Sequence, residues 1–350
     1  MEVKALKFGG LTAKRPIVQG GMGVGVSLSS LAGNVAKCGG VGTISGVHPG
    51  YREADFKENP FRANLRAIGN ELEKAKEIAN GGIIGFNFMT VMNHYEEYVK
   101  EAIAAGADFI VSGAGLPVNL AKYAAGTRAA ILPIVSSARA LKLIVKQWQR
   151  ADRLPDAVVV EGPLAGGHLG YPYGHLVDGT FDTLEDSLVD VVDYVRELEE
   201  KNGVKIPVIA GGGVRNHADM ERLMALGASG VQVGTKFVAT EECDAAPAFK
   251  QAYLRSRKED VQLIESPVGL AARAIRNSFL EKVEKQGRIP VQRCYQCMNH
   301  CKQAEAKYCI SQALIDAVQG REGLVFCGAN AYEIEKLSTV EKVMQELCGE

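Results

Sequence analysis

The sequence contains no long hydrophobic run: about 18 consecutive apolar residues, the length that suggests a membrane span, occur nowhere in it. A membrane partner is therefore not expected. The first residues, 1–6, lack the apolar core of a secretion signal, so a cytoplasmic location is expected. The chain also lacks an excess of charge of either sign. The formal net charge is −1 over 350 residues, which gives no reason to expect a nucleic-acid partner.

Short apolar runs alternate with helical patterns along most of the chain. Eight runs are read as buried parallel strands: Ile17–Gln19, Val41–Ile44, Ile83–Phe88, Phe109–Val111, Ile131–Val135, Ala157–Val160, Val208–Ala210 and Val231–Val233. Helices are expected at Ser29–Cys38, Tyr95–Ala105, Ala138–Arg150, Leu184–Lys201, Ala218–Leu226 and Asp244–Arg255. This order predicts an α/β fold, a (β/α)8 TIM barrel, with a doubly wound open sheet as the alternative.

The pattern changes after about residue 240, and a turn-rich link begins at Ser266. We therefore assign residues 1–265 to the barrel and 266–350 to a C-terminal cap that is cysteine-rich and mostly helical. Helices of the cap are expected at Ala271–Lys285, Ile310–Val318 and Val340–Leu347, and a short strand at Gly323–Gly328.

Three glycine loops follow predicted barrel strands. They contain Gly20, Gly21, Met22 and Gly23 after the first strand, Gly211, Gly212 and Gly213 after the seventh, and Gly234 with Thr235 after the eighth. The loops after strands seven and eight of such a barrel usually bind phosphate, through exposed N–H groups. The phosphate belongs to either a substrate or a cofactor. Because the Gly-x-Gly-x-x-Gly unit of dinucleotide sites is missing, FMN fits better than FAD.

A fourth loop, after the sixth strand, carries Glu161, Gly166, Gly167 and His168. Paired glycines suggest close approach of a backbone or flat ligand, and His168 is the best candidate for moving a proton near neutral pH. Asn87, at the end of the third strand, either bonds a flavin or caps the strand. Glu161 likewise bonds the flavin or substrate, or has a structural role.

Four of the eight cysteines lie close together: Cys294, Cys297, Cys301 and Cys309. In a reducing compartment such a group indicates a metal site rather than disulfides. Two centres take four thiolates, a [4Fe–4S] cluster and structural zinc. The spacing lacks the second Cys-x2-Cys pair of a zinc ribbon, which favours the cluster.

The motifs Gln19–Gly23, Ala165–His168, Ala210–Gly213 and Gln232–Phe237 resemble, in this order, the 2-nitropropane dioxygenase/nitronate monooxygenase superfamily of FMN-dependent TIM barrels. The resemblance implies that the glycine loops and Gln232 bind FMN and that His168 is the catalytic base. The cysteine segment resembles a narrower branch, the FMN and [4Fe–4S] enzymes that dehydrogenate and isomerise acyl-ACP in unsaturated fatty acid synthesis.

The branch implies an oxidoreductase that acts on an acyl thioester, by dehydrogenation, isomerisation or enoyl reduction, with acyl carrier protein as its partner. The alternatives are a nitronate monooxygenase that uses O2 and, in another class, a flavin redox sensor. Basic residues of the segment 270–308 either form a solvated face or dock the acidic carrier protein, and Arg273 and Arg276 are the residues we would test. A homodimer is one option for the oligomeric state, which the sequence does not set.

Overall fold

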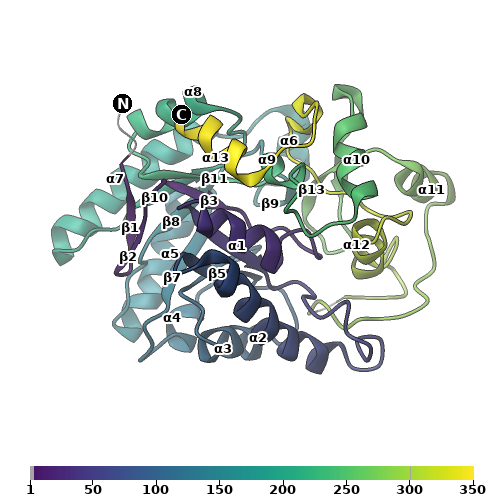
Figure 1. Cartoon of the computed structure of the whole chain (residues 1–350), viewed down its shortest axis with the longest axis horizontal. Helices are drawn as coiled ribbons and strands as arrows, with labels where there is room; N and C mark the ends of the chain where they lie inside the picture. Colours follow the sequence, from purple (N-terminus) through teal and green to yellow (C-terminus); the bar gives the residue numbers. More distant parts are fainter. Residues whose placement is uncertain (1–3, 300) are drawn as a thin grey trace.

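The computed structural model describes residues 4–299 and 301–350. Its centre is a closed barrel of eight parallel strands (Figure 1). These strands are β3 (Ile17–Gln19), β4 (Val41–Ser45), β5 (Ile83–Met89), β6 (Phe109–Gly113), β7 (Ala130–Val135), β8 (Val158–Glu161), β10 (Val208–Gly211) and β11 (Gly230–Val233). Because β11 pairs with β3, the sheet has no open edge. The predicted TIM barrel is confirmed, and the doubly wound alternative is wrong.

Helices follow the strands. They are α1 (Ser29–Lys37), α2 (Pro60–Ala79), α3 (Tyr95–Ala104), α4 (Leu120–Tyr123), α5 (Ala138–Trp148), α6 (Tyr173–Asp178), α7 (Leu184–Asn202), α8 (His217–Ala225), α9 (Thr235–Val238) and α10 (Pro247–Arg255). Most of them cover the outside of the barrel, whereas α6 packs on a separate small sheet and α10 lies beside the C-terminal cap (Figure 1). The six predicted helices agree with α1, α3, α5, α7, α8 and α10 within three residues at each end. Local signals set these ends: α7 begins with a capping box between Thr183 and Asp186 and ends at Gly203, whose φ is +66°.

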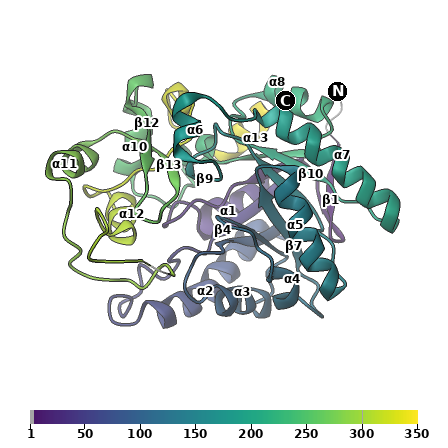
Figure 2. The same ribbon diagram turned by 180° about the vertical axis from the view of Figure 1, so that it is seen from behind.

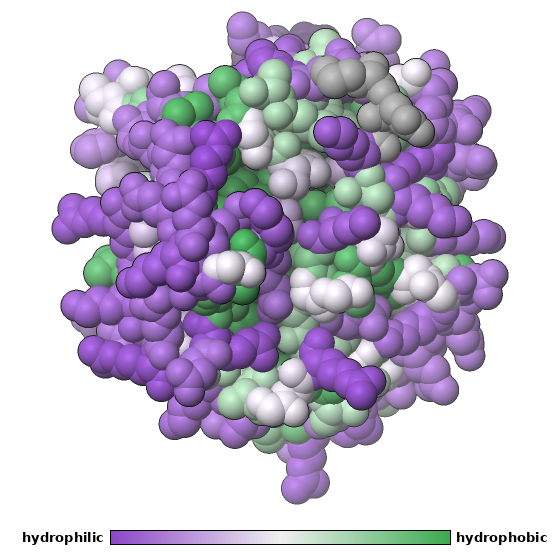
Figure 3. Space-filling view, turned by 90° about the vertical axis from the view of Figure 1, so that its left-hand side faces the viewer, coloured by the Kyte–Doolittle hydropathy of each residue, from purple (hydrophilic) through white to green (hydrophobic). Residues whose placement is uncertain are grey.

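Alternation along the strands divides the core into two parts. In β8, Val158 and Val160 pack between the barrel and its helices, whereas Val159 faces the barrel interior. The interior is closed at the N-terminal end by an antiparallel hairpin, β1 (Leu6–Phe8) and β2 (Leu11–Ala13). Seen from this end, the outer surface is largely hydrophilic, with a band of hydrophobic and neutral residues through its middle (Figure 3).

The cap differs from the prediction at its start. Residues Ala271–Ile275 form strand β13, not the first turns of a helix, and α11 covers only Ser278–Gln286. The alanines favour a helix, but β13 pairs on both sides, with β12 (Val261–Glu265) and with β9 (Gly167–Leu169). All five residues of β13 are buried in this three-stranded antiparallel sheet, so tertiary pairing overrides the local preference.

Two other cap helices were predicted correctly, α12 (Ile310–Val318) and α13 (Val340–Cys348). The predicted strand Gly323–Gly328 is wrong: within the described chain this segment forms one isolated bridge, between Phe326 and Ala274. Helices α11 and α12 lie at the end of the molecule opposite α7, whereas α13 returns to pack on α1 and α8 (Figure 1 and Figure 2). The domain boundary at residue 265 stays a prediction. Among the residues that the structure describes, no helix is both long and apolar enough to cross a membrane.

Candidate active site

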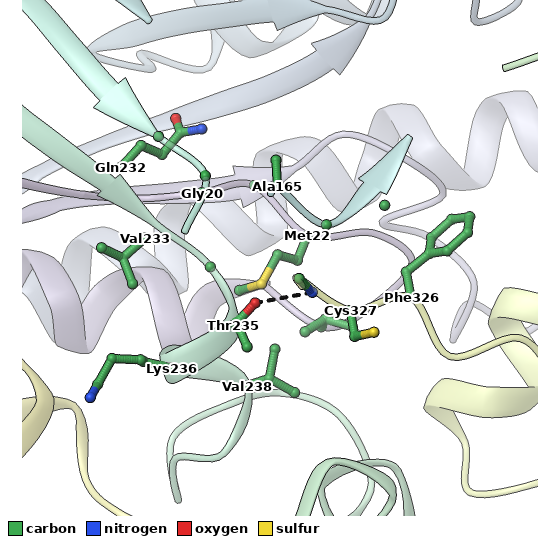
Figure 4. A pocket seen from close by; sticks show the side chains of 18 of the residues that line it. Gly20, Met22, Ala165, Gln232, Val233, Thr235, Lys236, Val238, Phe326 and Cys327 are labelled. Carbon is green, nitrogen blue, oxygen red and sulfur yellow. Dashed lines mark hydrogen bonds between the residues drawn. The ribbon is translucent and has the colours of Figure 1, made fainter. Parts of the chain in front are cut away.

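A cavity of about 460 Å³ opens at the C-terminal end of the barrel, where the predicted glycine loops meet. It is lined by every predicted cofactor residue and by the predicted base: Gly20, Gly21, Met22, Gly23, Asn87, Glu161, Gly166, Gly167, His168, Gly211, Gly212, Gly213, Gln232, Gly234 and Thr235. Figure 4 shows part of this lining, with Met22, Ala165, Gln232 and Thr235 around one space. The structure thus brings these residues together, and their individual roles stay predictions.

Strand register explains why residues so distant in sequence meet here. Glu161 ends β8 on the same side as the inward-facing Val159, two residues before it. Gly211 is the register partner of both Glu161 and Gln232, so three neighbouring strands place one polar layer at the mouth. On the other side of the barrel, Asn87 is paired in the same way with Ser45.

Glycine is required at two of the loop positions by the backbone and its neighbours. Gly212 has a φ of +101°, and a Cβ added there would lie 3.0 Å from the carbonyl oxygen of Gly162. Gly21 leaves no room either, because an added Cβ would come within 2.4 Å of the Asn87 Cβ. Bare backbone therefore faces the cavity, as a phosphate or a flat ring system needs.

The Thr235 hydroxyl is held at the edge of the cavity. Its oxygen accepts a hydrogen bond of 3.2 Å from the Gly328 N–H (Figure 4). Since that bond uses only a lone pair, the hydroxyl hydrogen remains available for an anion in the cavity. Gly328 belongs to the C-terminal cap, so the cap completes the wall of the barrel site.

His168 lies on β9, at the boundary between barrel and cap. Its backbone is fixed by register pairing with Ala272, and its ring packs edge-on against Phe326, with 5.1 Å between the ring centroids. The Nε2 atom lies 2.8 Å from the Ser266 hydroxyl oxygen. Burial lowers the pKa of His168 to about 4, so the ring is neutral at physiological pH and can accept a proton.

Glu161 is the one carboxylate inside the barrel mouth among the predicted site residues. Burial raises the pKa of its carboxyl group to about 7, since desolvation disfavours the charged form. Its backbone carbonyl oxygen accepts a hydrogen bond of 3.1 Å from the Tyr171 hydroxyl, which ties β8 to the loop after β9. The side chain can therefore hold or release a proton near neutral pH.

Sequence reasoning did not assign roles to the cap residues that shape this site. Ser266 and Phe326 contact the His168 ring, and the Gly328–Asn330 segment lines the cavity. The sequence does mark a turn at Ser266 and a glycine at position 328. Neither feature indicates which barrel residue the segment will contact.

A second cavity, of about 450 Å³, is lined by all four clustered cysteines, Cys294, Cys297, Cys301 and Cys309. The Gln296 N–H donates a 3.3 Å hydrogen bond to the Cys294 sulfur. Within the described residues, no three acidic, histidine or cysteine side chains converge closely enough to hold a metal ion. His300, which we had considered as a ligand, lies outside the described residues.

A small third cavity, of about 30 Å³, lies between the other two. His168 lines both this cavity and the large one, and Cys297 lines both this cavity and the cysteine cavity. The predicted base and the predicted metal ligands are therefore separated by a short, largely apolar space.

Arg273 fits neither the solvated face nor the docking surface considered for the basic residues, because it is buried. Its side chain is only 7% exposed and donates a hydrogen bond from Nη1 to the Ala165 carbonyl oxygen, because β13 is the middle strand of its sheet. Arg273 instead supports the loop that carries His168. Arg276 is exposed and pairs with Glu281, with 3.2 Å between Nε and Oε1.

Several proteins with known structures have the same fold. FabK from Thermotoga maritima superposes with a TM-score of 0.72 at 24% identity, covering 96% of this chain and 92% of its own. Nitroalkane oxidase from Streptomyces ansochromogenes gives 0.67 at 19% identity, covering 96% and 95%. The enoyl reductase domain of MlnA from Bacillus amyloliquefaciens gives 0.67 at 15% identity, covering 95% and 93%. At these identities the similarity shows a shared fold.

Sequence comparison shows the family. A probable nitronate monooxygenase from Staphylococcus saprophyticus is 25% identical over 308 residues, which cover 81% of this chain and 82% of the relative. A probable nitronate monooxygenase from Staphylococcus haemolyticus is 35% identical over 136 residues, 39% of this chain and 36% of the relative. Residues 4–350 match the family described as nitronate monooxygenase, in which FMN is the typical cofactor. The chain therefore belongs to the nitronate monooxygenase family and is an oxidoreductase.

Proposed function

We propose that this protein is an FMN-dependent oxidoreductase that acts on acyl thioesters, dehydrogenating and isomerising an acyl-ACP or reducing an enoyl-ACP, and that its four clustered cysteines hold a [4Fe–4S] cluster. One observation carries the proposal. The His168 ring lies on the wall of the glycine-lined cavity and also on the wall of the small cavity that reaches Cys297. A proton-handling group thus stands between two sites suited to redox centres.

The residues present fit FMN. The bare backbone at Gly211–Gly213, with the hydroxyl of Thr235, suits the phosphate, and a Cβ at Gly212 would press on the Gly162 carbonyl and displace this loop. Asn87, Gln232 and Glu161 are polar groups at the barrel mouth that suit the ring system and the ribityl chain. When bound, FMN would supply hydride exchange with the substrate.

His168 would handle the α-proton of the acyl thioester. The thioester carbonyl makes this proton acidic, and a neutral imidazole can accept it. Because Nε2 is hydrogen-bonded to Ser266, Nδ1 is the ring nitrogen that would accept this proton. In the direction of enoyl reduction the same ring would return a proton to the α-carbon.

The cysteine donor set fits an iron–sulfur cluster. All four thiols line one cavity, and thiolates are the usual ligands of such clusters. Structural zinc is the alternative, but it needs four sulfurs about 2.3 Å from a single point. The four thiols line one cavity of about 450 Å³, and a set of four cysteines without a second Cys-x2-Cys pair is the feature that favours the cluster.

A nitronate monooxygenase is the second candidate function, and the family match and the names of the curated relatives favour it. In that case the same cavity would bind a nitronate, and O2 would be the oxidant. The cysteine cavity would then have a structural role.

Anaerobic reduction separates the two candidates. Purified protein is mixed with decanoyl-ACP or with a nitronate, loss of the visible flavin absorbance is followed, and iron and zinc are measured on the same sample. Flavin reduction by decanoyl-ACP, with about four iron atoms per chain, is the expected result. Reduction by the nitronate alone would establish the second function. No reduction by either, together with no reoxidation of chemically reduced flavin by an enoyl-ACP, would contradict both.

A further inference from the structure

We propose that Glu333 and Glu346 of the C-terminal cap determine which flavin this protein accepts: they close the phosphate end of the large cavity, admit the mononucleotide FMN and exclude the dinucleotide FAD. The inference rests on the FMN proposed above, and it assigns a specificity-determining role to two carboxylates outside the glycine loops. Both residues line the large cavity together with two cations of the barrel, Arg215 and Lys236.

The two cations lie directly after the predicted phosphate loops in the chain. Arg215 comes two residues after Gly213, in the loop before α8, and Lys236 follows Thr235 in α9 (Figure 4). Arg215 and Lys236 are the only arginine and lysine among the described residues that line the cavity. The attraction of this wall for a phosphate therefore depends on these two side chains and on the exposed N–H groups of the glycine loops.

Cap carboxylates already engage both cations. The Lys236 Nζ atom lies 2.7 Å from Glu346 Oε1, and the Arg215 Nη1 atom lies 3.7 Å from Glu333 Oε1. Arg215 also pairs with Asp219, with 2.9 Å between Nε and Oδ2. Opposite charges at these distances compensate one another, so neither cation is left over for a second phosphate.

The two carboxylates belong to parts of the cap that are fixed to the barrel. Glu333 ends the single turn η3 (Ala331–Glu333), whose first N–H donates to the Gly328 carbonyl oxygen at 3.2 Å. Gly328 is itself hydrogen-bonded to the Thr235 hydroxyl in the cavity wall. Glu346 lies on α13, which buries its apolar side, including Leu347, in the core. Both acidic side chains therefore project from anchored backbone.

A mononucleotide and a dinucleotide flavin differ only beyond the first phosphate. FMN ends there, so its phosphate can be held without displacing the cap. FAD continues with a second phosphate, a ribose and adenine, and this extension would have to pass Glu333 and Glu346. The second phosphate would meet two like charges and would break the ion pairs that join cap and barrel. The arrangement thus gains specificity by repelling the wrong ligand.

The test is a comparison of flavin affinities. The flavin that the purified full-length protein carries is identified and removed, and the protein is titrated with FMN, FAD and riboflavin while flavin fluorescence is followed. The variants are Glu333→Gln, Glu346→Gln and the double variant, which remove charge at nearly constant size. Glu335→Gln is the matched control, because Glu335 is exposed in the same segment and does not line the cavity. If the double variant fails to fold, the single variants carry the test.

Wild-type protein should carry FMN and bind it more tightly than FAD. The ratio of FMN affinity to FAD affinity should fall about tenfold in the double variant, since each charge removed at a partly exposed site changes an affinity about threefold. Riboflavin, which has no phosphate, should bind equally to all variants, and Glu335→Gln should match the wild type.

Two kinds of result would contradict the inference. An unchanged ratio in Glu333→Gln, Glu346→Gln and the double variant, or equal affinities of the wild type for FMN and FAD, would overturn the selective role of the carboxylates and leave the flavin site intact. Wild-type protein that binds neither flavin would overturn the proposed cofactor and the inference together.

Discussion

The Nε2 atom of His168 lies 2.8 Å from the hydroxyl oxygen of Ser266, a residue 98 positions later in the chain. This contact joins the barrel loop after β8 to the turn between β12 and β13, and it fixes one ring nitrogen of the candidate base. Ser266 is held in turn by its own backbone, since its N–H donates to the Leu270 carbonyl oxygen at 2.9 Å. The orientation of the imidazole is therefore a property of the cap as much as of the barrel.

Ser266→Ala should lower kcat about fivefold with little change in KM. The hydroxyl orients the ring without touching the cavity centre, and a hydrogen bond of this kind is worth about 1 kcal/mol. Steady-state kinetics with an acyl thioester would measure the effect, and flavin content should stay at the wild-type value. A loss confined to KM would contradict an orienting role for Ser266.

His168→Ala should retain the flavin but lose turnover by about 10²–10⁴, the usual contribution of a general base. His175→Ala is the matched control, because His175 lies in the same connection but is exposed in α6. Stopped-flow reduction of the flavin by substrate separates this step from reoxidation. If His168→Ala reduces its flavin as fast as His175→Ala, another group removes the proton.

Gly212→Ala should weaken FMN binding at least tenfold. The φ of +101° disfavours any side chain, and the new Cβ would press against the Gly162 carbonyl, so the phosphate loop must shift. Gly174→Ala is the control, since a Cβ added at Gly174 meets nothing within 4 Å. Fluorescence titration of flavin-free protein with FMN gives both affinities, and equal values would argue against a phosphate site at this loop.

Glu161→Gln should stabilise the flavin-free protein increasingly as the pH rises. The pKa of Glu161 is about 7 in the folded protein and 4.5 in the unfolded chain, so the folded state binds this proton more tightly. The free energy of unfolding of the wild type therefore falls as the pH rises from 4.5 to 7. The variant keeps a neutral side chain at every pH. Above pH 7 its free energy of unfolding should exceed that of the wild type by at most about 3 kcal/mol. Urea denaturation at pH 5 and pH 8 would measure it. Glu58→Gln, at an exposed site, should show no such pH dependence.

The double variant Lys285→Glu with Arg288→Glu should raise KM for an acyl carrier protein substrate and leave KM for a small acyl thioester unchanged. Both side chains are exposed near the end of α11, and their charges would attract an acidic partner. Lys201→Glu, on α7 at the opposite end of the molecule, is the control (Figure 2). Equal KM changes for both substrates would contradict docking at α11.

Much of the fold was predictable because its signals are local. The eight apolar runs correspond to barrel strands, and side-chain alternation in β8 sends Glu161 inward once Val159 is known to be inside. The glycine loops could be assigned to one site because parallel barrel strands bring their C-terminal ends together. His168 belongs to the same loop system, so its presence at this mouth was also predictable.

Other features needed the tertiary structure. Ala271–Ile275 has the composition of a helix, and only its pairing with β9 and β12 makes it a strand. That strand buries Arg273, which the sequence had suggested lies exposed on either a solvated face or a docking surface. The Ser266–His168 contact likewise depends on β13, because it joins segments that no local pattern relates.

The sequence by itself determined the barrel and the glycine loops and named His168 and the four cysteines as candidates, since each follows from residue type and short-range spacing. The tertiary structure alone decided how the cap meets the barrel: which hydroxyl holds His168, and which cap residues line the barrel cavity. The physical reason is that these contacts form between side chains far apart in sequence, and their partners are chosen by packing and by the need to satisfy buried polar groups.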